Sequence, residues 1–322
     1  MLAAYVSKPA PDDPLFALEV GERPDPEPRD GWTTVQVKAA SLNHHDVFSL
    51  RGVGLPEDRM PMILGCDAAG TDEDGNEVIV HAVISDSSWT GDETLDPKRS
   101  LLSERHQGTL AEKVLVPTRN VLPKPAELSF PEASCLATAW LTAYRMLFTK
   151  SGVHPGDTVL VQGASGGVAT ALISLASAAG LRVWATGRTE DKRALAGELG
   201  AHATFESGAR LPERVDAVFE TVGEATWAHS LKSLKPGGCV VVSGSTSGAA
   251  PPADLQRVFF LQLSVIGSTM GTREELARLI RFCQTSGVRP RIDVTMPLAD
   301  ARDGFARMIG GHTAGKIVFT LD

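Results

Sequence analysis

A run of small residues near the middle of the chain has the composition of a phosphate-binding turn. Thr158–Val161 is a short apolar segment, typical of a strand buried on both faces of a parallel sheet. The run from Ala169 to Ala179 has the spacing and propensity of a buried helix. Between them lie Ala164, Ser165, Gly166, Gly167 and Val168. A strand, tight turn and helix in this order would direct unpaired N–H groups and a positive helix end toward a pyrophosphate.

The glycine pattern of this turn is incomplete. Ala164 and Ala169 stand where the dinucleotide-binding fingerprint has its first and last glycines, and only the pair Gly166–Gly167 remains. Tight strand-to-helix turns also occur for purely structural reasons. The turn alone therefore favours nucleotide binding but leaves the structural alternative open.

The charges after the second strand of this unit bear on the choice of cofactor. No Asp or Glu ends the segment Val183–Thr186, although NAD sites usually place an acid there for the ribose. Gly187 leaves room, while Arg188 and Lys192 could reach a 2′-phosphate, which favours NADPH. The alternative is that both cations only solvate the surface of the next helix.

The composition limits the class of protein. A length of 322 residues with 43% hydrophobic residues suggests two domains with large cores, and a formal charge of −8 argues against nucleic acid or an anionic membrane as partner. The first twenty residues lack the apolar core of a signal peptide, and no apolar run is long enough to span a membrane. We expect a cytoplasmic protein. Its four cysteines occur singly and are expected to be reduced core residues: Cys66, Cys135, Cys239 and Cys283.

Two different patterns divide the chain. Residues 1–120 are β-rich and dense in turns, which predicts a compact, partly antiparallel, barrel-like domain. Residues 85–107 are polar and unpatterned, as in a protruding lobe or a mobile loop. Residues 131–150 have the spacing of a buried helix that joins the domains.

The second pattern continues after the phosphate-binding turn. Buried strands are predicted at 182–185, 215–219 and 239–242, alternating with helices at 191–199, 226–234 and 274–283. Such alternation predicts a doubly wound sheet of five or six parallel strands. Residues 314–320 form a last strand that could return to the first domain.

Several segments along nearly the whole chain resemble one family, the medium-chain dehydrogenase/reductases, and specifically its zinc-independent quinone oxidoreductase and enoyl reductase branch. They are AASLNHHDVFSLRG from Ala39, ILGCDAAG from Ile63, QGTLAEKVLVP from Gln107, LTAYRML from Leu141, QGASGGVA, ETVG at Glu220, KPGGCVVVSG from Lys235 and the terminal AGKIVF. The resemblance implies an α/β protein with a GroES-like β-barrel catalytic domain, residues 1–125 and 290–322, and a Rossmann NADP-binding domain, residues 126–289. It also implies an active site in the cleft between the domains, and a homodimer that pairs through the last strand of the cofactor sheet, Leu263–Gly267.

The resemblance also implies that the chain holds no metal. The positions corresponding to the catalytic zinc ligands are Asn43, Cys66 and Thr138, of which only Cys66 is a competent ligand. The neighbouring Asp67 would not restore the set. The polar lobe contains none of the cysteines that hold a structural zinc in the zinc enzymes.

Further cofactor contacts follow from the resemblance. They are Thr138 and Thr142, Val222 and Gly223 after the fourth strand, Ser243 and Gly244 after the fifth, Gly267, Ser268 and Thr269 after the sixth, and Lys316 near the pyrophosphate or ribose. His44 could meet the cofactor phosphates. Lys316 could equally be an exposed strand charge.

Without a metal, the site suits conjugated acceptors, because hydrogen bonds can stabilise charge that spreads over a quinone or an α,β-unsaturated carbonyl. By resemblance, Asn43 would donate a hydrogen bond and His45 would deliver or relay a proton. His45 could instead be a loop residue with satisfied hydrogen bonds. Phe48, Cys66 and Met270 would line the substrate pocket. The predicted function is NADPH-dependent reduction of such an acceptor; the alternatives are an NADPH-binding sensor or scaffold and a zinc-type alcohol dehydrogenase.

Overall fold

The computed structural model describes residues 1–55 and 57–321, and the chain divides into two compact units. The first contains residues 1–141 and 270–322, and the second contains residues 142–269. The sequence places the boundaries instead at 125/126 and 289/290. The first unit gains α9 (Arg273–Ser286) because this helix packs against the helical segment Leu136–Trp140.

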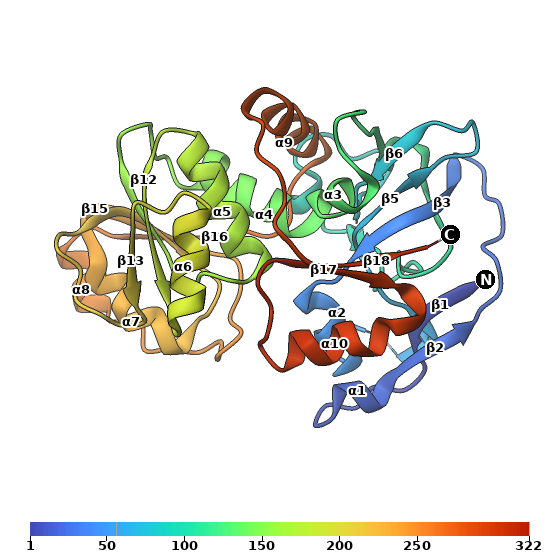
Figure 1. The fold of residues 1–322 in the computed structure, drawn as a ribbon, viewed down its shortest axis with the longest axis horizontal. Helices are drawn as coiled ribbons and strands as arrows, with labels where there is room; N and C mark the ends of the chain where they lie inside the picture. The colour runs from blue at the N-terminus through green and yellow to red at the C-terminus, as the bar shows by residue number, and fades with distance from the viewer. Residues whose placement is uncertain (56, 322) are drawn as a thin grey trace. The chain divides into compact units, whose positions relative to one another are not determined.

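A seven-stranded sheet forms the centre of the first unit (Figure 1). Its order is β10 (Val121–Pro123), β6 (Glu77–Val80), β5 (Ala68–Thr71), β3 (Trp32–Ser41), β18 (Lys316–Thr320) and β17 (Ile292–Pro297), and β9 (Lys113–Pro117) also pairs with β3. β18 runs antiparallel to β3, with Val318 opposite Ser41. The predicted return of the last strand to the first domain is confirmed. β17 is not predicted, because its residues are mostly half-buried and lack a clear apolar pattern.

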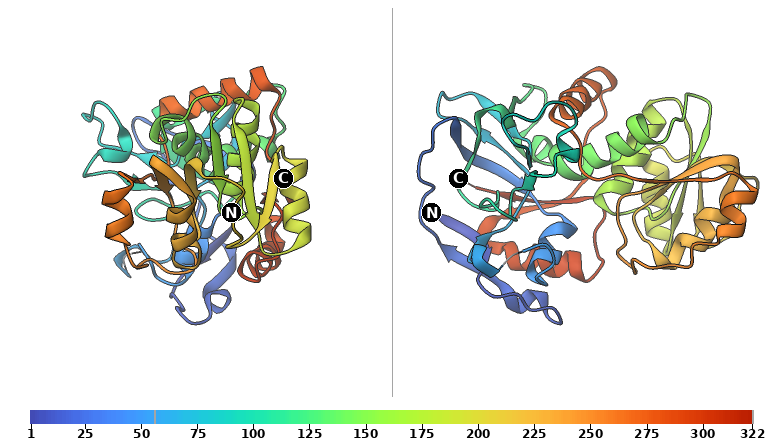
Figure 2. Two further views of the ribbon diagram at one scale, coloured as in Figure 1. Left: turned by 90° about the vertical axis from the view of Figure 1, so that its left-hand side faces the viewer. Right: turned by 180° about the vertical axis from the view of Figure 1, so that it is seen from behind.

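Smaller elements complete this unit. A second sheet contains β2 (Leu18–Glu22), β1 (Leu2–Val6) and β4 (Met62–Ile63). A two-stranded ribbon pairs β7 (Val83–Ile84) with β8 (Ser100–Leu101), which belongs to the polar lobe. The helix α10 (Ala301–Ile309) lies beside α1 (Pro14–Ala17) and α2 (His44–Leu50) (Figure 2). At least 250 residues separate α10 from either of these helices in the sequence. Their core includes Leu18, Leu50, Leu64, Phe305 and Phe319.

The predicted joining helix is helical but not regular. α3 (Phe130–Ser134) begins with a capping box formed by Ser129 and Glu132, and α4 (Leu141–Tyr144) lies between two π-helical segments, Leu136–Trp140 and Arg145–Lys150. The wider π turns shift side chains away from the spacing of a single α-helix. The boundary between the units falls within this stretch.

The second unit is a six-stranded parallel sheet. Its order is β13 (Ala203–Glu206), β12 (Arg182–Gly187), β11 (Thr158–Val161), β14 (Val215–Glu220), β15 (Leu234–Val242) and β16 (Ser264–Gly267). The helices are α5 (Gly167–Ala178), α6 (Glu190–Glu198), α7 (Glu224–Ser233) and α8 (Leu255–Phe260). The order reverses between β11 and β14, where doubly wound sheets bind their ligands. This confirms the predicted Rossmann arrangement.

No helix in the part of the chain that the structure describes is long and apolar enough to cross a membrane.

Candidate functional site

The small-residue turn connects β11 to α5 at the reversal point of the sheet. Gly166 is the N-cap of α5, and no side chain caps this helix end, so its first N–H groups have no partner within the helix. A Cβ atom added at Gly166 would meet no described atom within 4 Å. Packing within the protein therefore does not require glycine at this position. Close approach of a phosphate to the backbone would require it, because a side chain would occupy that space.

A buried polar chain fixes the strand ends around this turn. Thr186 accepts from the N–H of Gly163 at 3.2 Å and donates to Gln162 at 2.7 Å. Gln162 reaches Ser230 at 3.0 Å, and Ser230 donates to the buried Glu220 at 2.6 Å. These contacts join the carboxyl ends of three neighbouring strands. None of the four linking side chains is predicted, because only the fold brings them together.

The predicted cofactor residues after β14, β15 and β16 all lie at the same carboxyl edge, since the strands are parallel. They are Val222, Gly223, Ser243, Gly244, Gly267, Ser268 and Thr269. The N–H groups of Val222 and Gly223 donate to Glu220 at 2.8 and 3.1 Å, and the Ser243 hydroxyl lies 3.0 Å from the sulfur of Met146. The contacts of these three residues with a cofactor stay predictions.

Two hydroxyl groups predicted to contact the cofactor are buried without a partner. Thr138 Oγ1 in the first unit and Ser268 Oγ in the second make no hydrogen bond to any described residue. Buried polar atoms are nearly always satisfied, so each orphaned oxygen indicates a missing ligand or water. The cofactor contacts of Thr138 and Ser268 stay predictions.

Positive charge gathers after β12. Arg188 is exposed, and Lys192 at the start of α6 is half-buried. Burial lowers the pKa of Lys192, and the nearby Arg188 lowers it further. Two adjacent like charges repel each other, and a bound phosphate would relieve that repulsion. The room expected at Gly187 is filled by Arg193, whose Cγ would lie 3.0 Å from an added Cβ.

In the first unit, the predicted Asn43 belongs to a buried charged network. Lys316 Nζ donates to the carbonyl of Leu42 at 2.9 Å, to Asn43 Oδ1 at 2.6 Å and to Asp67 Oδ2 at 3.2 Å. Asn43 Nδ2 and Ser41 Oγ also donate to Asp67, at 2.8 and 2.7 Å. The side chain of Lys316 is 2% exposed.

These contacts exclude the alternative that Lys316 is an exposed strand charge. Its ammonium group pairs with Asp67 inside the protein, because β18 pairs with β3 next to that carboxylate, and its contact with a cofactor stays a prediction. Asn43 is likewise held by internal partners, and its donation to a substrate stays a prediction.

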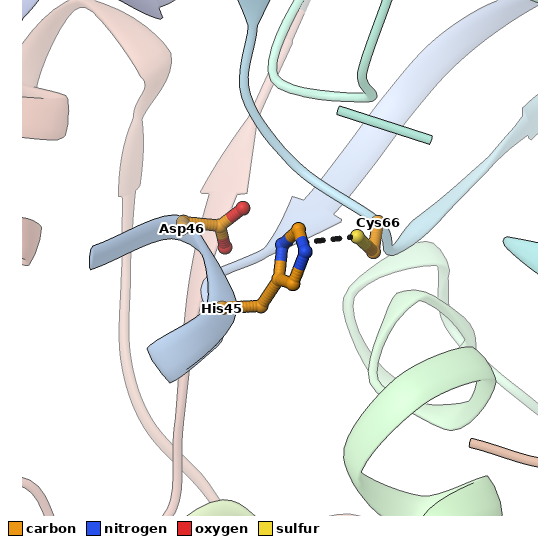
Figure 3. Close-up of side chains that lie close together, drawn as sticks. All are labelled: His45, Asp46 and Cys66. Atoms are coloured by element: carbon orange, nitrogen blue, oxygen red, sulfur yellow. Dashed lines mark hydrogen bonds between the residues drawn. The ribbon is translucent and has the colours of Figure 1, made fainter. Parts of the chain in front are cut away.

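The helix α2 presents His45 toward Cys66 (Figure 3). Asp46 fixes the start of this helix, since its two oxygens accept from the N–H groups of Asn43 at 2.8 Å and Gly65 at 2.9 Å. His45 Nδ1 lies 3.5 Å from Cys66 Sγ, and its Nε2 lies 3.1 Å from Glu104. Cys66 and then Glu104 raise the pKa of His45 well above its usual value.

The other predicted residues around this site have different surroundings. His44 is exposed and Phe48 is half-buried on α2. Met270 packs against the apolar core of the first unit. In the second unit, Thr142 is buried. Glu104 is not predicted, because it comes from the polar lobe, 59 residues from His45.

The donor atoms in the first unit do not fit a catalytic zinc ion. His45, Asp46 and Cys66 offer ligand atoms within 4.8 Å of one another. Both Asp46 oxygens, however, accept backbone N–H groups that hold α2 and the loop before β5. Within this described group only His45 and Cys66 stay available, fewer than the three protein ligands of a catalytic zinc site, and Asn43 and Thr138 supply neither thiolate nor imidazole.

Comparison with known proteins agrees with this architecture. Residues 29–126 match the alcohol dehydrogenase GroES-like domain, and residues 167–285 match a family described as zinc-binding dehydrogenase. An acryloyl-coenzyme A reductase of Metallosphaera sedula is 27% identical, with 94% of this chain and 96% of that protein covered. A human quinone oxidoreductase is 28% identical, with 92% and 91% covered.

A solved structure described as an NAD-dependent alcohol dehydrogenase is 32% identical, covers all of both chains and has a TM-score of 0.92. The GroES-like first unit, the Rossmann second unit and these similarities agree along the chain. The chain belongs to the medium-chain dehydrogenase/reductase superfamily of oxidoreductases.

Proposed function

We propose that this oxidoreductase uses NADPH to reduce a conjugated acceptor, a quinone or an α,β-unsaturated carbonyl compound, without a metal ion. The observation that carries the proposal is the network of Lys316, Asp67 and Asn43, in which a buried ammonium group contacts Asn43, one of the three positions that correspond to zinc ligands in the zinc enzymes. Relatives named acryloyl-coenzyme A reductase and quinone oxidoreductase support this class of acceptor.

The second unit has the residues to hold the cofactor. The N–H groups at Gly166, Gly167 and Val168 would bind the pyrophosphate, while Arg188 and Lys192 would bind the 2′-phosphate. When bound, NADPH supplies a hydride. The orphaned hydroxyls of Thr138 and Ser268 are suited to donate to or accept from its polar groups.

The first unit has a proton source. His45 is partly exposed, and Cys66 and Glu104 raise its pKa, so the imidazole is suited to accept a proton and pass it on. Glu104 orients this ring from the opposite side. His45 would protonate the acceptor after reduction, and Phe48 and Met270 would shape the apolar part of the pocket.

The test is oxidation of NADPH by purified protein with a panel of quinones, enals and enones, repeated with NADH. Metal content is measured on protein purified without chelator. We expect turnover of at least one conjugated acceptor, preference for NADPH and less than stoichiometric zinc. Tight NADPH binding without oxidation by any acceptor would favour a sensor or scaffold instead. Tightly bound zinc with NAD⁺-dependent alcohol oxidation would favour the alcohol dehydrogenase alternative, the activity named for one structural relative.

We also propose that two copies pair through the edge of the Rossmann sheet. β16 is the last strand of that sheet, and its Val265 is 50% exposed. Nearby in sequence, α8 exposes Leu255, Phe259 and Phe260 by 69% or more. An open strand edge with exposed large apolar side chains is typical of an interface.

A further inference from the structure

We propose that Cys66, His45 and Glu104 form a thiol-activating triad, and that Cys66 is a site of covalent addition for small α,β-unsaturated carbonyl compounds. The proposal rests on these side chains alone. It does not require the reductase activity proposed above.

The three side chains stand in the order nucleophile, base and orienting carboxylate. Cys66 Sγ lies 3.5 Å from His45 Nδ1, and His45 Nε2 lies 3.1 Å from Glu104 Oε1. Glu104 accepts a hydrogen bond when Nε2 carries the proton, which leaves the Nδ1 lone pair directed to the thiol. The same arrangement activates thiols in enzymes that use a cysteine nucleophile.

Polar groups surround both the imidazole and the sulfur. Cys66, Glu104 and Asp46 are the charged or titratable groups that act on His45, and each raises its pKa. The thiol can also donate to the carbonyl of Leu102 at 3.2 Å. Ser103 Oγ lies 3.4 Å from Nδ1 and 3.6 Å from Sγ, so it can hydrogen-bond a thiolate.

Exposure limits which reagents can react. Cys66 is 1% exposed, whereas the side chains of His45 and Glu104 are 25% and 30% exposed. A reagent must therefore approach alongside the imidazole, which restricts the site to small molecules. An α,β-unsaturated carbonyl is a soft electrophile of suitable size and reacts readily with thiolates.

The addition is balanced without another reagent. The thiol proton moves to His45 Nδ1, and a sulfur electron pair forms a C–S bond to the β-carbon. The electrons of the C=C bond move toward the carbonyl oxygen, giving an enolate. The imidazolium returns its proton to the α-carbon, so the product is a thioether and nothing is oxidised or reduced overall.

The other three cysteines provide an internal comparison. Burial raises the pKa of Cys135 and of Cys283 to about 12, and it also raises the pKa of Cys239. These thiols stay protonated at neutral pH. Among the hydrogen bonds of the described residues, the sulfur of Cys66 contacts an imidazole, whereas those of Cys135 and Cys239 contact backbone carbonyls, so we expect selective reaction at Cys66 among the four free cysteines.

The experiment treats the full chain with methyl vinyl ketone at pH 7, without nicotinamide cofactor, and follows adducts by intact mass and peptide mapping. We expect Cys66 to react at least about tenfold faster than any other cysteine, and His45→Gln to slow it by about 100-fold, within the range of general base catalysis. Glu104→Gln should slow it less. Cys239→Ser is the matched control and should leave the rate at Cys66 unchanged.

Thermal unfolding checks that each variant folds, and labelling after denaturation should give equal rates at Cys66 in wild type and His45→Gln. The proposal is overturned if folded protein labels Cys66 no faster than Cys239, or if folded His45→Gln reacts like wild type. It is also overturned if Cys66 becomes reactive only after a chelator is added, since a bound metal would then hold the thiol.

Discussion

Replacing Lys316 by methionine tests the buried network most directly. The substitution keeps an unbranched side chain, one atom shorter, but removes a cation that is 2% exposed and contacts Leu42, Asn43 and Asp67. Asp67 is 0% exposed and would keep only the hydrogen bonds from Ser41 and Asn43. Removing one partner of a buried ion pair costs about 3–5 kcal/mol. We expect the free energy of unfolding to fall by that amount.

Urea unfolding at pH 7 measures this effect. The matched control is Lys113→Met, because Lys113 pairs with Asp25 at the surface and is 37% exposed. That change should cost no more than about 1 kcal/mol. In the double variant Lys316→Met/Asp67→Asn no charge is left unpaired, so most of the loss should be recovered. If Lys316→Met is no less stable than the control, the ammonium group does not neutralise Asp67 as described.

Four further predictions concern the cofactor, the proton source and the interface. Gly166→Ala should leave thermal stability unchanged but weaken NADPH binding in calorimetry at least about tenfold, whereas Gly197→Ala, also in open space, should not alter binding. Arg188→Ala should raise KM for NADPH and leave KM for NADH unchanged; an equal rise for both would contradict a 2′-phosphate contact. The pKa of His45 is raised in the folded protein, so protonation of this ring stabilises the fold. That stabilisation is complete below about pH 6.5, the pKa in the unfolded chain, and is lost as the pH rises through the folded pKa. In urea titrations, the difference in free energy of unfolding between wild type and His45→Gln should therefore become smaller as the pH rises. Val265→Asp should convert a dimer to a monomer in sedimentation analysis, and an unchanged mass would exclude pairing through β16.

The apolar strands of the second unit could be predicted because parallel strands buried on both faces leave continuous apolar runs in the sequence. β13 was missed since its four residues are half-buried or exposed. α8 was missed because it buries no residue, so it has no apolar stripe to detect. Burial therefore decides which elements the apolar pattern predicts, and the mostly exposed β16 is expected only through the family resemblance.

The cofactor turn could be predicted because all its residues are contiguous. The surroundings of Lys316 could not, since Asp67 is 249 residues away and only the pairing of β18 with β3 brings the two together. The position of the Glu104 carboxylate could not be predicted either, because the polar lobe shows no periodic pattern from which its structure could be inferred. Long-range charge pairs are therefore the part of such a site that sequence patterns predict least.

The position of β18 within its sheet also affects how the protein can be made. This strand lies between β3 and β17, yet it contains residues 316–320. During synthesis the whole second unit leaves the ribosome before β18 does, and it can fold while the first unit is still incomplete. Until then β3 has an unpaired edge, and Asp67 lacks its cation. A nascent chain stalled before residue 316 would therefore contain a folded Rossmann unit attached to an incompletely folded first unit. We expect this form of the chain to bind chaperones most strongly.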